Sequence, residues 1–142
     1  MSFDPDGTQR WSHDIGNFGS IMTSPALGAD GSVYVIVYAK VRDNTTNPAT
    51  IKHIAELHRF SGGGGLLWHV PLEVVASQSV NPGDPDILTF SAPNILHFGN
   101  SDVVMLASGR RQEFSQVFLT AISAAEQAIP ELLGRLDCSR LH

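Results

Sequence analysis

The chain alternates short apolar segments with clusters of Gly, Pro, Asp and Ser, a pattern typical of antiparallel strands joined by tight turns. The strongest segment, residues 33–38, is apolar on both alternating faces, with three valines on one side and two tyrosines and an isoleucine on the other. A strand covered on both faces belongs inside a stack of sheets. The pattern therefore predicts a layered, all-β fold.

Glycine-rich turns separate these segments. Asp30 and Gly31 stand immediately before the 33–38 segment, and the glycines 62–65 stand between two further apolar segments. Hairpin turns need a positive φ, which glycine adopts without steric cost. Each cluster therefore predicts a hairpin. The polar residues 41–50 and the Ser/Pro/Asp-rich residues 77–89 are predicted to be exposed loops.

The spacing of these signals repeats. A Phe is followed eight residues later by a Trp in 3–11 and again in 60–68, with a glycine at the same place in both. After each Trp a proline-containing segment leads into a β-branched run, and the Trp-to-Pro distance grows from 14 to 25 residues, which predicts an eleven-residue insertion in the second copy. The predicted structural repeat positions are Gly7, Trp11, Pro25, Asp30, Gly31, Gly64, Trp68 and Pro93.

The C-terminal part departs from the repeat. Ile122 aligns with the phenylalanine, but Glu126 stands in place of the glycine and Pro130 in place of the tryptophan. A capping-box pattern starts immediately after Ile122, and isoleucine and leucine residues follow at helical spacing. We therefore expect a helix over about 123–137, with a strand over 119–130 as the alternative.

The segment Ser-Pro-Ala-Leu-Gly-Ala-Asp-Gly-Ser-Val-Tyr-Val (24–35), followed by Phe-Ser-Gly-Gly-Gly-Gly-Leu-Leu-Trp (60–68), resembles the pyrroloquinoline-quinone-type β-propeller repeat of quinoprotein dehydrogenase-like proteins. The resemblance implies four-stranded antiparallel blades, with the glycine hairpin joining the last two strands and the tryptophan packing between neighbouring blades. We expect about two blades of an incomplete propeller with a C-terminal helix. The expected divisions are a repeat end (3–11), a full repeat (about 12–68), a second repeat (about 69–122) and a helix with tail (123–142).

The number of blades is too small for a ring. A closed propeller needs about four to eight blades, and this chain holds the end of one repeat, one full repeat and most of another. The chain could be a fragment of a longer gene product, one of several copies in a ring, or an open two-sheet unit. Because an open unit exposes blade faces and strand edges, we expect a homo-oligomer or a protein partner that covers them.

Composition narrows the function classes. Nine Lys and Arg against fourteen Asp and Glu give a net charge of −5 and no basic stripe, which argues against nucleic-acid binding. No apolar run approaches the length of a membrane span. The N-terminus shows no signal peptide. A cytoplasmic location is the default expectation, and a periplasmic or extracellular one would follow if the chain were a fragment of an exported propeller.

The sequence gives only weak support for a metal-binding site or a phosphate-binding site. Asp4 and Asp6 lack the other ligands of a calcium loop, and a strand rather than a helix follows the glycines 62–65, so turns are predicted at both places. His53 and His58 are five residues apart and would lie on opposite faces of a strand, and His69 and His97 show no paired spacing.

The sequence also gives weak support for a functional role of the single cysteine and of a basic pair. Cys138, the only cysteine, can form no internal disulfide and has no evident catalytic base. The basic pair Arg110 and Arg111 is interpreted as a solvated turn after a strand that ends at Ala107. We therefore predict no catalytic, cofactor-binding or metal residue.

We expect a non-catalytic binding or assembly module that acts by self-association or by capture of a protein partner. The alternative is a fragment of a quinone-dependent dehydrogenase, inactive in isolation. Only in that case does the resemblance imply a cofactor, pyrroloquinoline quinone with calcium, and much of that enzyme branch carries a vicinal cysteine pair where this chain has one cysteine in all.

Overall fold

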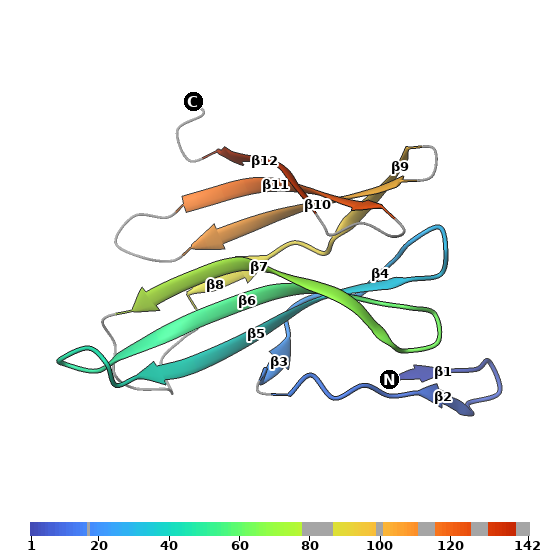
Figure 1. The fold of residues 1–142 in the computed structure, drawn as a ribbon, viewed down its shortest axis with the longest axis horizontal. Helices are drawn as coiled ribbons and strands as arrows, with labels where there is room; N and C mark the ends of the chain where they lie inside the picture. The colour runs from blue at the N-terminus through green and yellow to red at the C-terminus, as the bar shows by residue number, and fades with distance from the viewer. Residues whose placement is uncertain (17, 78–86, 99–100, 111–115, 126–130, 139–142) are drawn as a thin grey trace.

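The computed structural model describes residues 1–16, 18–77, 87–98, 101–110, 116–125 and 131–138. All regular secondary structure in these residues is β-strand, which confirms the predicted all-β class. The strands form three antiparallel sheets, none of which is closed (Figure 1). The smallest sheet is an N-terminal hairpin of β1 (Ser2–Phe3) and β2 (Gln9–Trp11).

The two larger sheets share one topology. In sheet 1 the strand order is β3-β5-β6-β7, and β4 pairs with β5 beside β3. In sheet 2 the order is β8-β10-β11-β12, and β9 pairs with β10 beside β8. Sheet 1 consists of β3 (Ser20–Ile21), β4 (Ala26–Leu27), β5 (Val33–Asp43), β6 (Thr50–Phe60) and β7 (Leu66–Ser77). Sheet 2 consists of β8 (Leu88–Phe90), β9 (Asn94–Phe98), β10 (Ser101–Arg110), β11 (Gln116–Ala125) and β12 (Glu131–Asp137).

A proline interrupts the first strand of each sheet at the same place. Pro25 lies between β3 and β4, and Pro93 lies between β8 and β9. Proline has no N–H to donate, so a ladder cannot continue unbroken through it. The interruption explains why each sheet begins with two short strands on one long neighbour.

Three turns have the same backbone geometry. Gly7, Gly31 and Gly64 have φ angles of 87°, 80° and 93°. In each turn the glycine N–H donates to the carbonyl oxygen three residues earlier, at 2.9, 3.1 and 2.9 Å respectively. Three-residue hairpin loops place a left-handed residue at this position, which glycine occupies without the penalty of a Cβ.

The hairpins also share their register. Trp11 lies opposite Ser2 in the N-terminal hairpin, and Trp68 lies opposite Arg59 in the β6–β7 hairpin. In both hairpins the register shifts by one residue between that pair and the pair nearer the turn. The spacing that repeats in the sequence thus corresponds to a repeated local structure.

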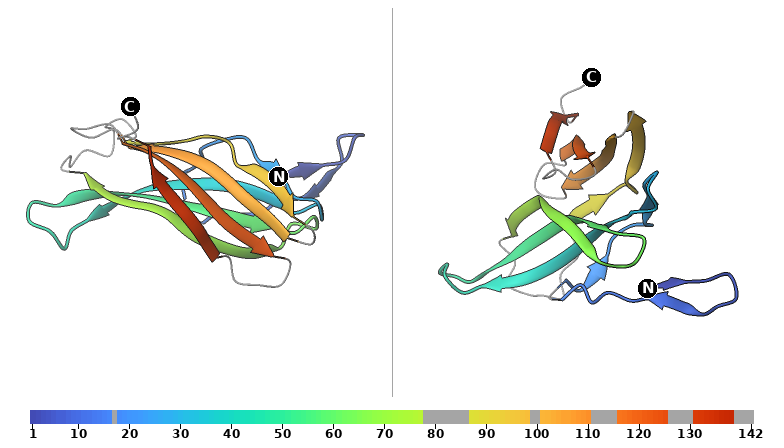
Figure 2. Two further views of the ribbon diagram at one scale, coloured as in Figure 1. Left: turned by 90° about the horizontal axis from the view of Figure 1, so that it is seen from above. Right: turned by 45° about the vertical axis from the view of Figure 1, so that its right-hand side comes forward.

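Sheet 1 lies between the N-terminal hairpin and sheet 2 (Figures 1 and 2). Tyr34 and Ile36 on one face of β5 pack against Val104 and Leu106 of sheet 2. Val35 and Val37 on the other face pack with Phe60 against Ile15 and Phe18 of the segment that follows the hairpin. The prediction that residues 33–38 are covered on both faces is therefore confirmed.

The predicted C-terminal helix is wrong. Residues 116–125 form β11 and residues 131–137 form β12, which pair antiparallel with Leu119 opposite Leu136. The leucines have helical spacing, but as a strand this segment pairs with β11. The backbone N–H and C=O groups along that edge of β11 would otherwise have no hydrogen-bond partners. Glu126 and Pro130 lie outside the described residues.

The predicted loops are shorter than expected. Strand β5 continues to Asp43 and β6 begins at Thr50, so only residues 44–49 of the predicted loop 41–50 connect them. Within the predicted loop 77–89, Ser77 ends β7 and β8 begins at Leu88, while 78–86 lie outside the described residues. Residues 69–77 continue β7 and therefore belong to sheet 1.

Candidate functional site

Trp11 anchors the N-terminal hairpin on sheet 1. Its ring lies 6.2 Å from the ring of Phe60 at an interplanar angle of 30°. Its indole Nε1–H donates a 3.0 Å hydrogen bond to the carbonyl oxygen of Gly62. The ring also covers Gly64, where a Cβ would come within 2.6 Å of it. The glycine turn is thus both a hairpin and the platform for a tryptophan.

Trp68 lies at the interface between sheets 1 and 2. Its ring centroid is 6.0 Å from that of Tyr34, and it packs in the same apolar cluster as Ile122. Ile122 is the counterpart of Phe60, because each lies next to a one-residue register shift in the hairpin between the last two strands of its sheet. Unlike Trp11, Trp68 has a buried Nε1 without a hydrogen-bond partner among the described residues.

The third hairpin differs at the tryptophan position. Gly134 lies opposite Ala121, next to the register shift, as Trp68 lies opposite Arg59. The sequence alignment placed Pro130 there, so that assignment is corrected. A Cβ on Gly134 would meet nothing within 4 Å. Sheet 2 therefore presents no tryptophan to a further unit.

Each of the two large sheets packs an equivalent face against the unit that precedes it in the chain. Sheet 1 presents Phe60 and the side of β5 that carries Val35 to the N-terminal segment. Sheet 2 presents the matching residues, Ile122 and Leu106, to sheet 1. Each unit therefore covers one defined face of the unit that follows it, in head-to-tail order.

A buried carboxylate joins the sheets near β7 and β12. The Glu73 side chain is only 2% exposed and accepts a 3.1 Å hydrogen bond from Nε of Arg110. It also pairs with Arg135, whose guanidinium carbon lies 3.9 Å from the Phe118 ring centroid. The interpretation of Arg110 as part of a solvated turn is wrong, because β10 continues to this residue.

A second polar contact crosses the same interface. The hydroxyl of Tyr34 donates to Oδ2 of Asp102 at 3.3 Å, and Asp102 also pairs with His97. Burial raises the pKa of Tyr34 to about 12. Within sheet 1, hydrogen bonds from Ser32, together with the charge of Arg59, lower the pKa of Asp30.

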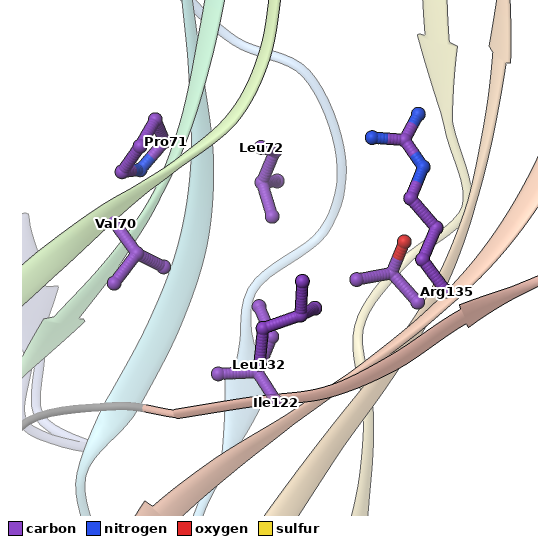
Figure 3. A pocket seen from close by; sticks show the side chains of 7 residues that line it. Val70, Pro71, Leu72, Ile122, Leu132 and Arg135 are labelled. Atoms are coloured by element: carbon purple, nitrogen blue, oxygen red, sulfur yellow. The ribbon is translucent and has the colours of Figure 1, made fainter.

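A cavity of about 230 Å³ opens between β7 and the last strands of sheet 2 (Figure 3). Its walls are mainly apolar, with Leu72 on one side and Ile122 and Leu132 on the other (Figure 3). Small-molecule sites usually have volumes of about 300–1,000 Å³ and a few convergent polar groups. We therefore interpret this cavity as a packing gap between sheets.

The outer face of sheet 2, which points away from sheet 1, is apolar and accessible. Leu119 on the central strand β11 is 37% exposed, and its neighbour Leu136 on β12 is 51% exposed. Alternation along the strands places further apolar residues on this face: Leu96, Val103, Met105, Ala107, Val117 and Ala121. At the start of β12 the register also places Glu131 on this face, opposite Ser123. On the inner face, Val104 and Ile122 are buried.

A cluster of two histidines and a carboxylate lies at the β6–β7 hairpin. Oε2 of Glu56 is 2.9 Å from Nε2 of His58 and 3.1 Å from Nδ1 of His69. His58 is buried, Glu56 is half-buried and His69 is 53% exposed. All three potential ligand atoms lie within 4.8 Å of one another.

The spacing argument missed this cluster for a physical reason. It placed His53 and His58 on opposite faces, which agrees with the contacts of His53 with Tyr38 and of His58 with Phe18. It did not consider Glu56, two residues from His58 on the same face, or the strand opposite. The cross-strand position of His69 depends on the register shift between Arg59 and Phe60.

The other residues considered from the sequence make ordinary structural contacts. Oδ1 of Asp6 accepts a 2.9 Å hydrogen bond from the Thr8 N–H in the first glycine turn, and Asp4 pairs with Arg10. Cys138 is a free thiol whose backbone N–H donates to Val117. Among the described residues, no helix is long and apolar enough to cross a bilayer.

No family model, curated protein or solved structure matches this chain. The geometry of the chain itself must therefore support any functional conclusion.

Proposed function

We propose that this chain is a non-catalytic assembly module built from propeller-type repeats, and that it self-associates through the outer face of sheet 2. The observation that carries the proposal is the apolar outer face around Leu119 and Leu136, both of which are exposed. Contiguous exposed apolar surface of this kind is typical of protein–protein interaction sites.

The stacking order supports a sheet as the partner. In sheet 1 the face that corresponds to this outer face carries Tyr34 and Ile36, and sheet 2 covers it. The other stacking face, around Val35 and Phe60, is covered by the segment that follows the N-terminal hairpin. The outer face of sheet 2 is thus the stacking face that remains uncovered among the described residues.

In the proposed dimer, the outer face of sheet 2 in one copy packs against the same face in a second copy. Such a contact is isologous and closes at two subunits, so it forms no fibre. The centre of the face, around Leu119, Ala121 and Leu136, carries no charged residue, so a contact there removes no unpaired charge from water. Gly134, which stands where a tryptophan would project, lets a flat partner approach β12 closely.

Sedimentation or light scattering over a range of protein concentrations tests this proposal. We expect the wild-type chain to be a dimer that dissociates on dilution. Leu119→Lys places a charge at the centre of the face and should weaken dimerisation at least tenfold. Val74→Lys is the matched control, because Val74 is an exposed aliphatic residue on β7 in the other sheet.

A wild-type chain that is monomeric at every concentration would contradict the proposal. Equal effects of the two lysine substitutions would also contradict it, because the contact would then lie elsewhere. A monomer that binds a different protein through the Leu119 face would support partner capture instead.

The alternative, a fragment of a quinone-dependent dehydrogenase that is inactive in isolation, stays a prediction. Titration of the chain with pyrroloquinoline quinone and calcium distinguishes it from the assembly module. Saturable binding of the quinone would favour the dehydrogenase fragment.

A further inference from the structure

We propose that Glu56, His58 and His69 form a binding site for one divalent transition-metal ion, with Zn²⁺ as the preferred occupant. This site is separate from the proposed dimer face, since it lies on sheet 1 and on the side of β6 that faces the N-terminal segment. Binding at this site and dimerisation can therefore succeed or fail independently.

The positions of the ligand atoms are close to those required around a tetrahedral ion. Zinc bound at about 2.0–2.1 Å to nitrogen and oxygen requires ligand atoms about 3.3–3.4 Å apart. Oε2 of Glu56 lies 2.9 Å from Nε2 of His58 and 3.1 Å from Nδ1 of His69. The two histidine nitrogens lie within 4.8 Å of each other. Expansion of the two separations to Glu56 by a few tenths of an ångström, together with a rotation of the exposed His69 side chain on the edge strand β7, would admit the ion.

The backbone brings these side chains together without strain. Glu56 and His58 are two residues apart on β6, so both project from one face of the sheet. His69 is the direct cross-strand partner of His58 on β7, where side chains are close neighbours. The two imidazole rings have centroids 5.2 Å apart.

One ligand is held in place before an ion arrives. The ring of His58 makes an edge contact with Phe18 at 5.5 Å and lies 6.1 Å from Phe60. It is buried, whereas His69 on the opposite side of the cluster is exposed. The site therefore combines a fixed inner ligand with an accessible outer one, and an ion can enter from solvent beside His69.

The donor set selects the class of metal. Imidazole nitrogen suits Zn²⁺, Cu²⁺ and Ni²⁺, whereas Ca²⁺ and Mg²⁺ take oxygen ligands almost throughout. Three protein ligands leave a fourth position for water on the solvent side. Nδ1 of His58 has no hydrogen-bond partner among the described residues. Since outer partners of a metal-bound histidine contribute about 10–100-fold in affinity, we expect weaker binding than in a fully supported site.

Calorimetric titration of the untagged, chelator-treated chain with ZnCl₂ tests the proposal. We expect one Zn²⁺ per chain and a rise in Tm on binding. His69→Gln and Glu56→Gln should each weaken binding at least tenfold. His97→Gln is the matched control and should leave binding unchanged, because His97 is also exposed and paired with a carboxylate but has no second histidine in its pair.

Co²⁺ gives a second readout. We expect a visible ligand-field spectrum of a tetrahedral site without a thiolate charge-transfer band, because Cys138 is not a ligand in the proposed site. Circular dichroism of each metal-free variant verifies folding, and His69 is a suitable target because its exposed side chain can be replaced without opening a cavity.

Three results would overturn the site. They are the absence of Zn²⁺ binding by the wild type at millimolar metal, unchanged binding by His69→Gln, and an equal loss of binding in His97→Gln. None of them affects the dimer proposal, whose variant is Leu119→Lys.

Discussion

The indole of Trp11 covers Gly64 so closely that a Cβ on that glycine would lie 2.6 Å from the ring. Gly64 also has a φ of 93°, so the turn and the interface place separate demands on the same residue. The hairpin geometry requires the left-handed backbone, and the stacking of one unit on the next requires the missing side chain.

Gly64→Ala is therefore expected to destabilise the chain more than the same change at another left-handed glycine. Gly31→Ala should cost about 1–2 kcal/mol for its backbone conformation alone, because a Cβ there meets nothing within 4 Å. At Gly64 the displacement of Trp11 should add about 1–3 kcal/mol. Urea unfolding of both variants measures the difference, and equal losses of stability would show that the Trp11 contact contributes nothing.

Glu73→Gln should destabilise the contact between the two large sheets. The carboxylate is buried against Arg110 and Arg135, and its removal leaves two cations without their partner. Breaking a buried ion pair costs about 3–5 kcal/mol, and because both arginines are partly exposed we expect a loss of about 3 kcal/mol. Chemical denaturation checks this value.

The control for Glu73 is an exposed pair. Arg10→Gln removes the contact with Asp4, in which both side chains are exposed, and should cost less than about 1 kcal/mol. A Glu73→Gln variant as stable as Arg10→Gln would show that the sheets do not depend on this carboxylate.

Tyr34 should make the fold sensitive to alkali. Its folded-state pKa is raised to about 12 from the ordinary value of 10.0 because the side chain is buried. The stabilisation is fully present below pH 10 and is lost as the pH rises towards 12, since the unfolded chain releases the proton more easily. Two pKa units correspond to about 2.7 kcal/mol.

Urea midpoints measured between pH 8 and pH 12 for the wild type and for Tyr34→Phe test this dependence. The variant should lose the hydrogen bond to Asp102 at every pH and show a smaller decline above pH 10. Parallel curves for the two proteins would contradict the raised pKa. The slope below pH 10 should be the same in both.

Local chemistry in the sequence predicted much of the fold. Glycine turns at 7, 31 and 64 mark hairpins because a positive φ is a local requirement, and they lie where expected. Residues 33–38 showed a two-sided apolar pattern, and β5 is covered on both faces. The predicted helix over 123–137 was wrong. Helical spacing reflects only the preferences of neighbouring residues, whereas the pairing of Leu119 with Leu136 joins two strands that are separate in the sequence.

The candidate sites were less accessible to prediction. Without the register shift next to Phe60, His58 would face Trp68, and His69 would project from the other side of the sheet. The outer face of sheet 2 became visible only once β12 was known to be a strand. The contact of Glu73 with Arg110 and Arg135 joins residues far apart in the chain.

The sequence by itself determined the apolar strand segments before residue 108, the glycine turns and the repeated Phe-to-Trp spacing, because each depends on backbone preferences over a few residues. The tertiary structure alone decided which faces are covered, which strand lies beside β11, and which histidine lies opposite His58. Those features depend on register and stacking, where a shift of one residue moves a side chain to the opposite face of a sheet.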